Sequence, residues 1–277
     1  EAGMGGLHDS TNLFSPLAVI CPSIGLDHQA VLGNTHAEIA TEKAGVLKNG
    51  ASFIYATDRT DVRDVFKQKA NEEGSKTYEL GKDFTAEGSS HSFDFIYKEQ
   101  RLEGIALAMA GQHQVANASL AIMASLLLQK DYPKVTPELI KDALAHASWL
   151  GRTEFLMPNL MIDGAHNNES VKVLIDLLRS EYADKDIELL FAAIDTKPID
   201  SMLAQLESVG DLTVTSFEYP NSVKLDKYPV TYKQVSDFQT WIEEHVTAND
   251  DKLYVITGSL YFISQVRKWI LEQERAV

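Results

Sequence analysis

The sequence predicts an α/β protein with two domains, residues 1–149 and residues 150–277. In the second domain, short apolar runs typical of strands alternate four times with amphipathic helical patterns. The first domain begins with the same alternation and then carries two period-two segments on either side of a turn, which indicates a β-hairpin. A length of 277 residues suits two domains of ordinary size.

In the first domain, turn residues and helix caps divide the apolar segments. Thr35 can cap a helical segment that stops at Gly50, and Lys98 begins the turn of the hairpin. We expect strands at 17–25, 52–57 and 76–80, helical segments at 34–50, 61–73, 112–128 and 137–147, and a hairpin over 92–109. This order predicts a mixed sheet with helices.

The second domain is more regular, because each expected strand is followed by a helix. The strands are expected at 159–163, 187–194, 212–217 and 253–257, and the helices at 169–181, 198–206, 238–245 and 260–272. Consecutive βα units form parallel sheets with right-handed crossovers. We therefore expect a Rossmann-like parallel α/β domain.

Composition excludes several functional classes. The chain has 25 Lys and Arg residues against 40 Asp and Glu residues, a net charge of −15, which argues against broad binding of nucleic acid or anionic membranes. The longest apolar run, at 115–128, is shorter than the roughly 20 residues that span a bilayer. The single cysteine, Cys21, cannot form an internal disulfide. We expect a cytoplasmic protein whose anionic ligands meet local cations or a metal.

Two motifs of the second domain follow expected strands. "LMIDGAHNN" places Asp163 and His166 in a strand-to-helix turn, where open α/β sheets bind ligands. The alternative is a turn in which Asn167 or Asn168 only caps the helix. "ITGSLYF" places Ser259 between a strand and a helix N-terminus, a position that favours anions.

Three motifs of the first domain have both a functional and a structural interpretation. Asp27 and His28 in "SIGLDH" suit a metal site or a structural hydrogen bond. Lys43, with its neighbouring glutamate in "TEKAGVLK", suits a functional site or a solvated helix face. The polar residues of "GQHQVAN" suit ligand binding or the capping of a helix. None of these motifs is specific by itself.

In their order along the chain, six motifs together resemble the folylpolyglutamate synthase and dihydrofolate synthase family, a branch of the Mur ligase superfamily. The motifs are "EAGMGGLHDSTN", "SIGLDHQAVLGNTHAEIATEKAGVLKNG", "GQHQVANASLA", "LGRTEF", "IDGAHNNES" and "VITGSLYFISQVR". The resemblance implies part of a central ATPase domain over 1–149 and a Rossmann-like ligase domain over 150–277.

In that family, a glycine-lysine phosphate loop precedes the "EAGMGG" motif. The chain contains no G-x-x-x-x-G-K-[ST] sequence. We therefore expect a chain that lacks the N-terminal part of the ATPase domain and that is inactive alone.

The resemblance implies an ATP-dependent ligase that acts in one-carbon metabolism. ATP would phosphorylate a carboxylate of a reduced folate, and the amino group of L-glutamate would attack the acyl phosphate. Phosphoryl transfer depends mainly on positioning and charge neutralisation, which magnesium supplies. We expect a monomer with small-molecule substrates only.

Site residues are carried over from the family by motif. In the first domain, the resemblance assigns Glu1 and His28 to magnesium, and it makes Lys43 a lysine that is carbamylated and holds a second magnesium. It places His113, Gln114 and Asn117 against adenine or ribose. In the second domain, Arg152, Asp163 and His166 would reach nucleotide phosphate and ribose, and Ser259 would lie on the glutamate side. Lys43, His28 and Arg152 are the expected catalytic groups.

Two alternatives remain at this point. One is a Mur-type ligase acting on peptidoglycan precursors, although the H-Q-x-x-N and S-L-Y motifs favour folate. The other is a non-catalytic nucleotide-binding fragment.

Overall fold

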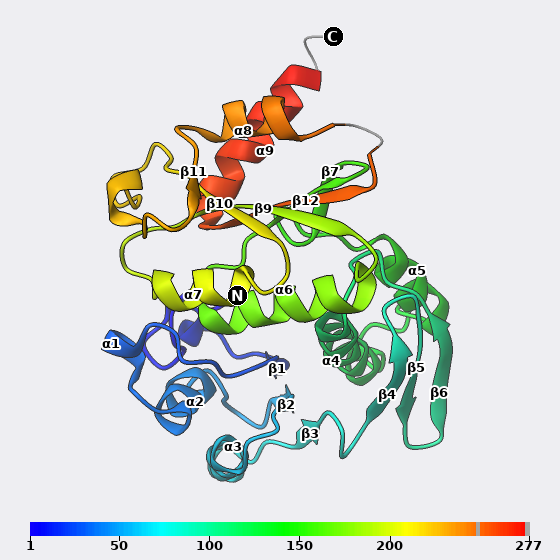
Figure 1. The fold of residues 1–277 in the computed structure, drawn as a ribbon. Helices are drawn as coiled ribbons and strands as arrows, with labels where there is room; N and C mark the ends of the chain where they lie inside the picture. The colour runs from blue at the N-terminus through cyan, green and yellow to red at the C-terminus, as the bar shows by residue number, and fades with distance from the viewer. Residues whose placement is uncertain (248–249, 275–277) are drawn as a thin grey trace. The chain divides into compact units, whose positions relative to one another are not determined.

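The protein is described by a computed structural model that covers residues 1–247 and 250–274 (Figure 1). The chain divides into two compact units, Glu1–Ala147 and Ser148–Val277. Both units combine strands and helices, so the predicted α/β class is confirmed. The division lies close to the predicted domain boundary after residue 149.

Unit 1 contains a three-stranded parallel sheet in the order β1-β2-β3. The strands are β1 (Ala18–Cys21), β2 (Ser52–Tyr55) and β3 (Thr77–Glu79). Side chains alternate across the sheet, so Phe53 and Tyr55 enter a core with Phe66, while Ile54 enters another core. The helices α2 (His36–Ala44) and α3 (Thr60–Glu72) supply the first of these cores.

The helix α2 begins as predicted and ends earlier than predicted. The Thr35 hydroxyl accepts from the Glu38 N–H, and the Glu38 carboxylate accepts from the Thr35 N–H, which makes a capping box. The expected continuation to residue 50 is wrong, because the N-terminal segment crosses the helix end. There, the Leu7 N–H donates to the Glu42 carbonyl oxygen at 2.9 Å.

A second sheet of unit 1 is antiparallel, in the order β4-β5-β6. Its strands are β4 (Thr85–Ser89), β5 (Ser92–Tyr97) and β6 (Gln100–Ile105). The predicted hairpin is therefore confirmed, whereas β4 was not predicted because most of its residues are polar or glycine. The buried residues of α4 (Gln112–Leu128) and of α5 (Pro137–His146) share a core with this sheet.

Unit 2 is built on a six-stranded sheet in the order β11-β10-β9-β12-β8-β7. Its strands are β7 (Glu154–Met157), β8 (Leu160–Asp163), β9 (Asp186–Ala192), β10 (Asp211–Val214), β11 (Lys233–Gln234) and β12 (Lys252–Gly258). Figure 1 shows α6 (Asn168–Glu181) and α7 (Ile199–Leu206) on one face and α8 (Phe238–His245) and α9 (Leu260–Glu274) on the other. The four predicted βα units are confirmed.

The sequence predicted a parallel sheet for unit 2, but the observed sheet is not wholly parallel. The strand β7 pairs antiparallel with β8 through Glu154 and Ile162, and β11 adds two residues at the far edge. Neither strand was predicted, since one is short and the other lies in a segment without clear alternation. The shorter elements η1 (Ser10–Leu13), α1 (Gln29–Leu32) and η2 (Leu225–Lys227) also lie outside the prediction.

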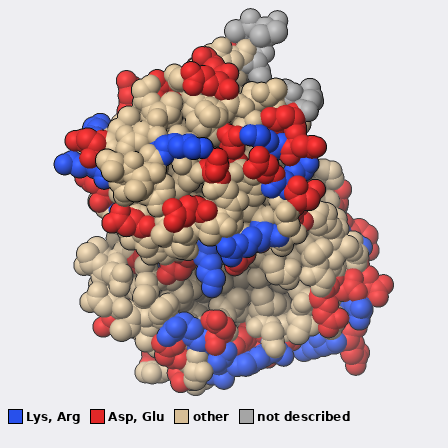
Figure 2. All heavy atoms as spheres, viewed as in Figure 1, with Lys and Arg blue, Asp and Glu red and all other residues tan. Residues whose placement is uncertain are grey.

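No helix in the described part of the chain is long and apolar enough to cross a membrane. Acidic side chains are spread over the face seen in Figure 2, with basic side chains among them. This distribution matches the net charge of −15.

The carboxyl end of β12 requires a glycine. Gly258 has a φ of +120°, and a Cβ at this position would lie 2.0 Å from the carbonyl oxygen of Ala192 on β9. Backbone atoms cannot yield as a flexible side chain does. The close approach of the two strands therefore depends on the missing side chain.

We expect Gly258→Ala to lower the free energy of unfolding by about 3 kcal/mol, because it adds backbone overlap to an unfavourable φ. Gly74→Ala is the matched control, since Gly74 also has a positive φ (+64°) and a Cβ added there would meet nothing within 4 Å. Urea unfolding measures both changes. Equal losses for the two variants would contradict the role of the strand contact.

Candidate functional site

The carboxyl edge of the six-stranded sheet gathers the strand-end motifs of unit 2. Thr257 at the end of β12 is the register partner of Asp163 at the end of β8. On its other side, β12 pairs Gly258 with Ala192 at the end of β9. Because β12 lies between β8 and β9, the segments that follow β8 and β9 begin on opposite sides of this central strand. Open α/β sheets bind ligands at such an edge.

Asp163 is a buried carboxylate with two backbone donors. The Thr153 N–H donates to its Oδ2 at 2.8 Å, and the Ala165 N–H donates to its Oδ1 at 2.9 Å. Burial raises the pKa of Asp163, and the two N–H groups, Arg152 and His166 act in the opposite direction. The carboxylate therefore joins the loop before β7 to the turn that leads into α6.

That turn begins α6 through a polar network. Asn167 is the N-cap, and its Oδ1 accepts from the Ser170 N–H at 2.8 Å. The Nδ1 atom of His166 lies 2.8 Å from the carbonyl oxygen of Gly164, and this contact fixes the ring orientation. The capping interpretation is thus confirmed for Asn167, and His166 remains half-buried at the same edge.

Arg152 lies in the loop that precedes β7, and its side chain is exposed. Within the described residues it forms no ion pair, while both of its neighbours are held. The Gly151 N–H donates to Glu154 Oε2 at 2.7 Å, and the Thr153 N–H donates to Asp163. A cationic side chain is therefore presented from a fixed loop at the carboxyl edge of the sheet.

Ser259 begins the turn from β12 into α9. Its N–H donates to the Ala192 carbonyl oxygen at 2.8 Å, and its hydroxyl accepts from the Tyr261 N–H at 3.3 Å. Ser259 is only 4% exposed, so its hydroxyl mainly organises the first turn of α9. The predicted sequence of strand, glycine turn and helix N-terminus is confirmed.

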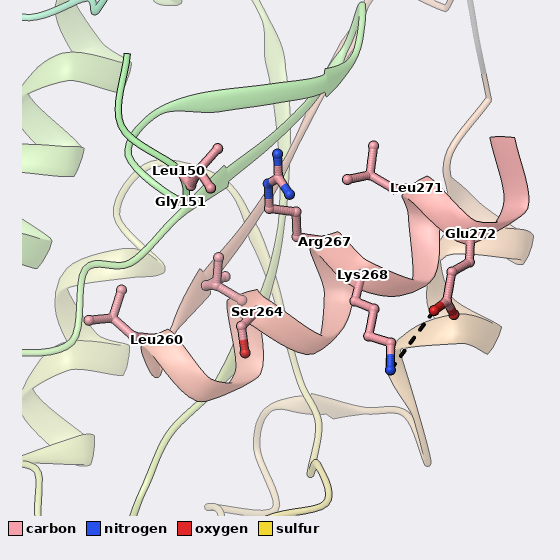
Figure 3. A pocket seen from close by; sticks show the side chains of 9 residues that line it. Leu150, Gly151, Leu260, Ser264, Arg267, Lys268, Leu271 and Glu272 are labelled. Carbon is pink, nitrogen blue, oxygen red and sulfur yellow. Dashed lines mark ion pairs between the residues drawn. The ribbon is translucent and has the colours of Figure 1, made fainter. Parts of the chain in front are cut away.

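A pocket of about 390 Å³ lies beside this edge, between α9 and the start of the Gly151 loop (Figure 3). Leu150, Leu260 and Ile263 supply apolar lining. In Figure 3, Arg267 points from α9 to the opposite side from Lys268, and Lys268 faces Glu272. The pocket and the strand-end residues thus share the Gly151 loop.

In unit 1, Lys43 lies in the last turn of α2, close to the carboxyl end of β1. Burial raises the pKa of the Cys21 thiol to about 11, and the positive charge of Lys43 partly opposes this rise. Lys43 and Glu42 are both half-buried. Lys43 is therefore more than part of a solvated helix face, because the charge of its ammonium group influences the Cys21 thiol at the end of β1.

The other residues assigned to magnesium, Glu1 and His28, are both exposed. Glu1 is the exposed first residue, and His28 is the exposed N-cap of α1 with a left-handed φ of 53°. The His28 N–H donates to Asp27 Oδ1 at 2.8 Å, which is a local structural bond. Across residues 1–247 and 250–274, no three His, Cys, Asp or Glu side chains form a metal-binding group. The assignment of Glu1, His28 and Lys43 to magnesium stays a prediction.

The helix α4 carries the third predicted group of unit 1. The predicted helix start is confirmed, and its N-cap is Gly111, which has no side chain to accept a capping hydrogen bond. Gln114 is buried, and its Oε1 accepts from Asn117 Nδ2 at 3.2 Å. His113 is half-buried in the first turn. Gln114 and Asn117 are therefore brought together one turn apart.

No family model matches the chain. Among curated proteins, the dihydrofolate synthase/folylpolyglutamate synthase of Bacillus subtilis is 33% identical to the chain over 286 residues, which cover 97% of the chain and 66% of that protein. The chain belongs to the dihydrofolate synthase/folylpolyglutamate synthase family. A second member, the folylpolyglutamate synthase of Lacticaseibacillus casei, is 29% identical, over 98% of the chain and 66% of that protein. The chain thus spans just under two thirds of these family members.

Solved structures of this family agree with the fold. The apo form of L. casei FPGS matches 98% of the chain and 65% of that protein, with a TM-score of 0.82 and 27% identity. A complex of FPGS with AMPPCP and folate matches with a TM-score of 0.81 and 26% identity, over 98% of the chain and 65% of the other protein. The fold is therefore the Mur ligase-like, two-unit fold of folylpolyglutamate synthases.

The sequence predicted that Asp163 and His166 follow a strand of unit 2, as observed. It did not predict the residues that hold the neighbouring loop in place. Asp163, Arg152 and His166 share one edge, since Arg152 and His166 both influence the Asp163 carboxyl electrostatically. Thr153 and Glu154 were not predicted, although both belong to the quoted "LGRTEF" motif. Arg267 ends the quoted "VITGSLYFISQVR" motif, but its contact with Glu154, 113 residues away, was not predicted.

The raised pKa of Asp163 predicts a pH-dependent stability. Between the unfolded and the folded pKa, the folded state keeps a proton that the unfolded state has lost, so stability falls as pH rises through this window. We expect the free energy of unfolding of the wild type, minus that of Asp163→Asn, to decrease from about pH 4 upward. Urea unfolding of both proteins at several pH values measures it, and a difference that rises with pH would contradict the burial effect.

Proposed function

We propose that the full-length protein is an ATP-dependent ligase that adds L-glutamate to a carboxyl group of a reduced folate. The observation that carries this proposal is the 33% identity to a dihydrofolate synthase/folylpolyglutamate synthase over 97% of the chain. The likeness to a complex of FPGS with AMPPCP and folate supports the same nucleotide and the same class of substrate. The proposal covers both dihydrofolate synthase and folylpolyglutamate synthase activity.

The proposed reaction has two steps. A carboxylate oxygen of the folate attacks the γ-phosphorus of ATP, the bond to the β-phosphate oxygen breaks, and ADP leaves. The amino group of glutamate then attacks the acyl carbon, phosphate leaves, and the nitrogen loses a proton. The first step converts a poor leaving group into a good one, and it needs positive charge around the transferred phosphoryl group.

Unit 2 supplies the proposed phosphate and ribose contacts. Arg152 is an exposed guanidinium on a fixed loop, and the guanidinium fork suits phosphate oxygens. Asp163 and His166 flank it at the sheet edge and would contact ribose or phosphate. Ser259 would lie on the glutamate side, at a helix N-terminus that favours a carboxylate.

Unit 1 supplies the proposed adenine and metal contacts. His113, Gln114 and Asn117 on α4 would contact adenine or ribose. Magnesium would be held by Glu1 and His28, and a second magnesium by Lys43 after carbamylation, which replaces an ammonium with an anionic oxygen group. Magnesium prefers oxygen ligands, which Glu1 and a carbamylated Lys43 would supply, whereas the assignment of His28 rests on the family resemblance.

The proposal includes a cytoplasmic monomer with small-molecule partners only. The free and buried Cys21 agrees with a reducing compartment. The net charge of −15 argues against a nucleic-acid partner.

The direct test is the release of ADP by the purified full-length protein with ATP, magnesium, L-glutamate and either dihydropteroate or tetrahydrofolate. We expect sustained ADP release only when a folate substrate and glutamate are both present, because the folate accepts the phosphoryl group in the first step and glutamate must consume the acyl phosphate in the second before another turnover begins. Mass spectrometry of the product should show one added glutamate. Arg152→Ala should lower kcat/KM about a hundredfold through loss of a phosphate contact.

Two outcomes would contradict this proposal. ADP release with UDP-muramyl substrates and not with folates would indicate a Mur-type peptidoglycan ligase. Nucleotide binding without turnover of any acceptor would indicate a non-catalytic nucleotide-binding protein. The chain 1–277 by itself is proposed to be inactive, and the same assay tests this.

Carbamylation of Lys43 predicts a dependence on carbon dioxide. Lys43→Ala should lose about a hundredfold in kcat and regain part of it with added acetate, whose carboxylate can occupy the vacated space. The wild type should lose activity after removal of carbon dioxide and recover with bicarbonate. Lys67→Ala, at an exposed lysine of α3, is the control and should match the wild type. A wild type indifferent to bicarbonate, with no ¹³C-carbamate signal, would contradict the assignment.

A further inference from the structure

The loop Gly151–Thr153 holds an unfavourable backbone conformation. Gly151 has a φ of +72° and Thr153 a φ of +42°. For a β-branched residue, the left-handed region costs about 1–3 kcal/mol and persists only where the surroundings enforce it. The Thr153 hydroxyl is also buried without a hydrogen-bond partner in the described structure. Neither property of Thr153 benefits the stability of the loop.

Two carboxylates enforce this conformation from opposite sides of Arg152. The Asp163 carboxylate accepts from the Thr153 N–H, and the Glu154 carboxylate accepts from the Gly151 N–H at 2.7 Å. The Gly151 carbonyl oxygen in turn accepts from the Gly164 N–H at 2.8 Å. The peptide groups on both sides of Arg152 are therefore fixed.

Glu154 is itself held from α9. The Nε of Arg267 donates to Glu154 Oε1 at 2.8 Å and to Oε2 at 3.1 Å. Both side chains are shielded from solvent, at 29% and 19% exposure. Figure 3 shows Arg267 leaving α9 on the side opposite to Lys268. One Glu154 carboxylate thus links α9 to the loop backbone.

The position of Glu154 depends on β7, the antiparallel edge strand. Glu154 is the first residue of β7 and is the register partner of Ile162 on β8, next to Asp163. The two carboxylates that hold the loop are therefore anchored on neighbouring strands. This arrangement sets the direction in which Arg152 leaves the loop.

We propose that Glu154 and Arg267 are positioning residues, which hold the Gly151–Thr153 loop so that the Arg152 guanidinium is presented to the nucleotide phosphate. This inference rests on the proposed function, in which Arg152 contacts phosphate. This arrangement would preorganise the loop. The free-energy cost of its strained conformation is met when the protein folds, so it does not reduce the affinity for the nucleotide.

A purely structural ion pair would hold β7 to α9 without affecting Arg152. The geometry separates the two roles, because the Glu154 carboxylate has a second partner in the Gly151 N–H. A charge swap, Glu154→Arg with Arg267→Glu, can restore an ion pair but leaves no acceptor for that N–H on residue 154. The swap should restore thermal stability and leave nucleotide affinity low.

The test measures the affinity of the full-length protein for magnesium-ADP by isothermal titration calorimetry. We expect Arg267→Met and Glu154→Gln each to weaken binding about tenfold, the loss expected when one charge-assisted contact is misplaced. In an Arg152→Ala background, neither change should weaken binding further. Arg267→Lys should recover part of the loss. A cooperative thermal unfolding transition shows that each variant is folded. If Arg267→Met does not fold, Glu154→Gln alone tests the inference.

The control is Lys252→Met, which breaks the half-buried pair of Lys252 with Glu188 at the amino end of β12 and should leave ADP affinity unchanged. The inference would be overturned if the losses of ADP affinity were additive in the Arg152→Ala background, or if the Glu154 and Arg267 variants lost no affinity. In either case, a loss of affinity from Arg152→Ala alone would still support the phosphate contact. No effect of Arg152→Ala would overturn both the contact and the inference. The ligase assay on the wild type tests the proposed reaction separately.

Discussion

The cost of desolvating one carboxylate, Asp163, organises the carboxyl edge of unit 2. A buried carboxylate needs donors, and here two backbone N–H groups supply them, one from the loop before β7 and one from the turn into α6. Because both donors belong to the backbone, their segments cannot move independently of the carboxylate. The exposed Arg152 and the half-buried His166 are thereby held on either side of the same group.

Much of the fold was predictable because its signals are local. Every strand that combines apolar residues with a following helix was found, and all four βα units of residues 150–277 are present. The strands β4 and β7 were missed because their pairing partners define them: β4 has glycine and polar residues, and β7 pairs antiparallel with β8. The helix α2 ends at Ala44 since a distant segment, at Leu7, occupies its last turn. Such tertiary causes are invisible to periodicity.

In the candidate site, too, features set by local sequence were predictable and features set by distant contacts were not. Strand ends of a parallel sheet meet at one edge, so the motifs around Asp163 and Ser259 could be placed from the sequence alone. The support of Arg152 could not, because Arg267 and Glu154 stand in two separate motifs 113 residues apart and only the folded structure brings them into contact. In unit 1, the sequence identified Lys43 by motif, whereas its proximity to the buried Cys21 emerges only from the packing of α2 on β1.

The order of strands in unit 2 has a consequence for biosynthesis. The strand β12 is made last of the strands described, yet it lies at the centre of the sheet, with β9 on one side and β8 on the other. Until β12 has been synthesised, β8 and β9 have no common neighbour, and the backbone N–H and C=O groups on their facing edges remain unpaired. Long-range pairing of this kind is slow and exposes nascent chains to aggregation. Folding of this unit is therefore completed only after nearly all of it has been synthesised, and chaperones that cover exposed strand edges would act in that interval.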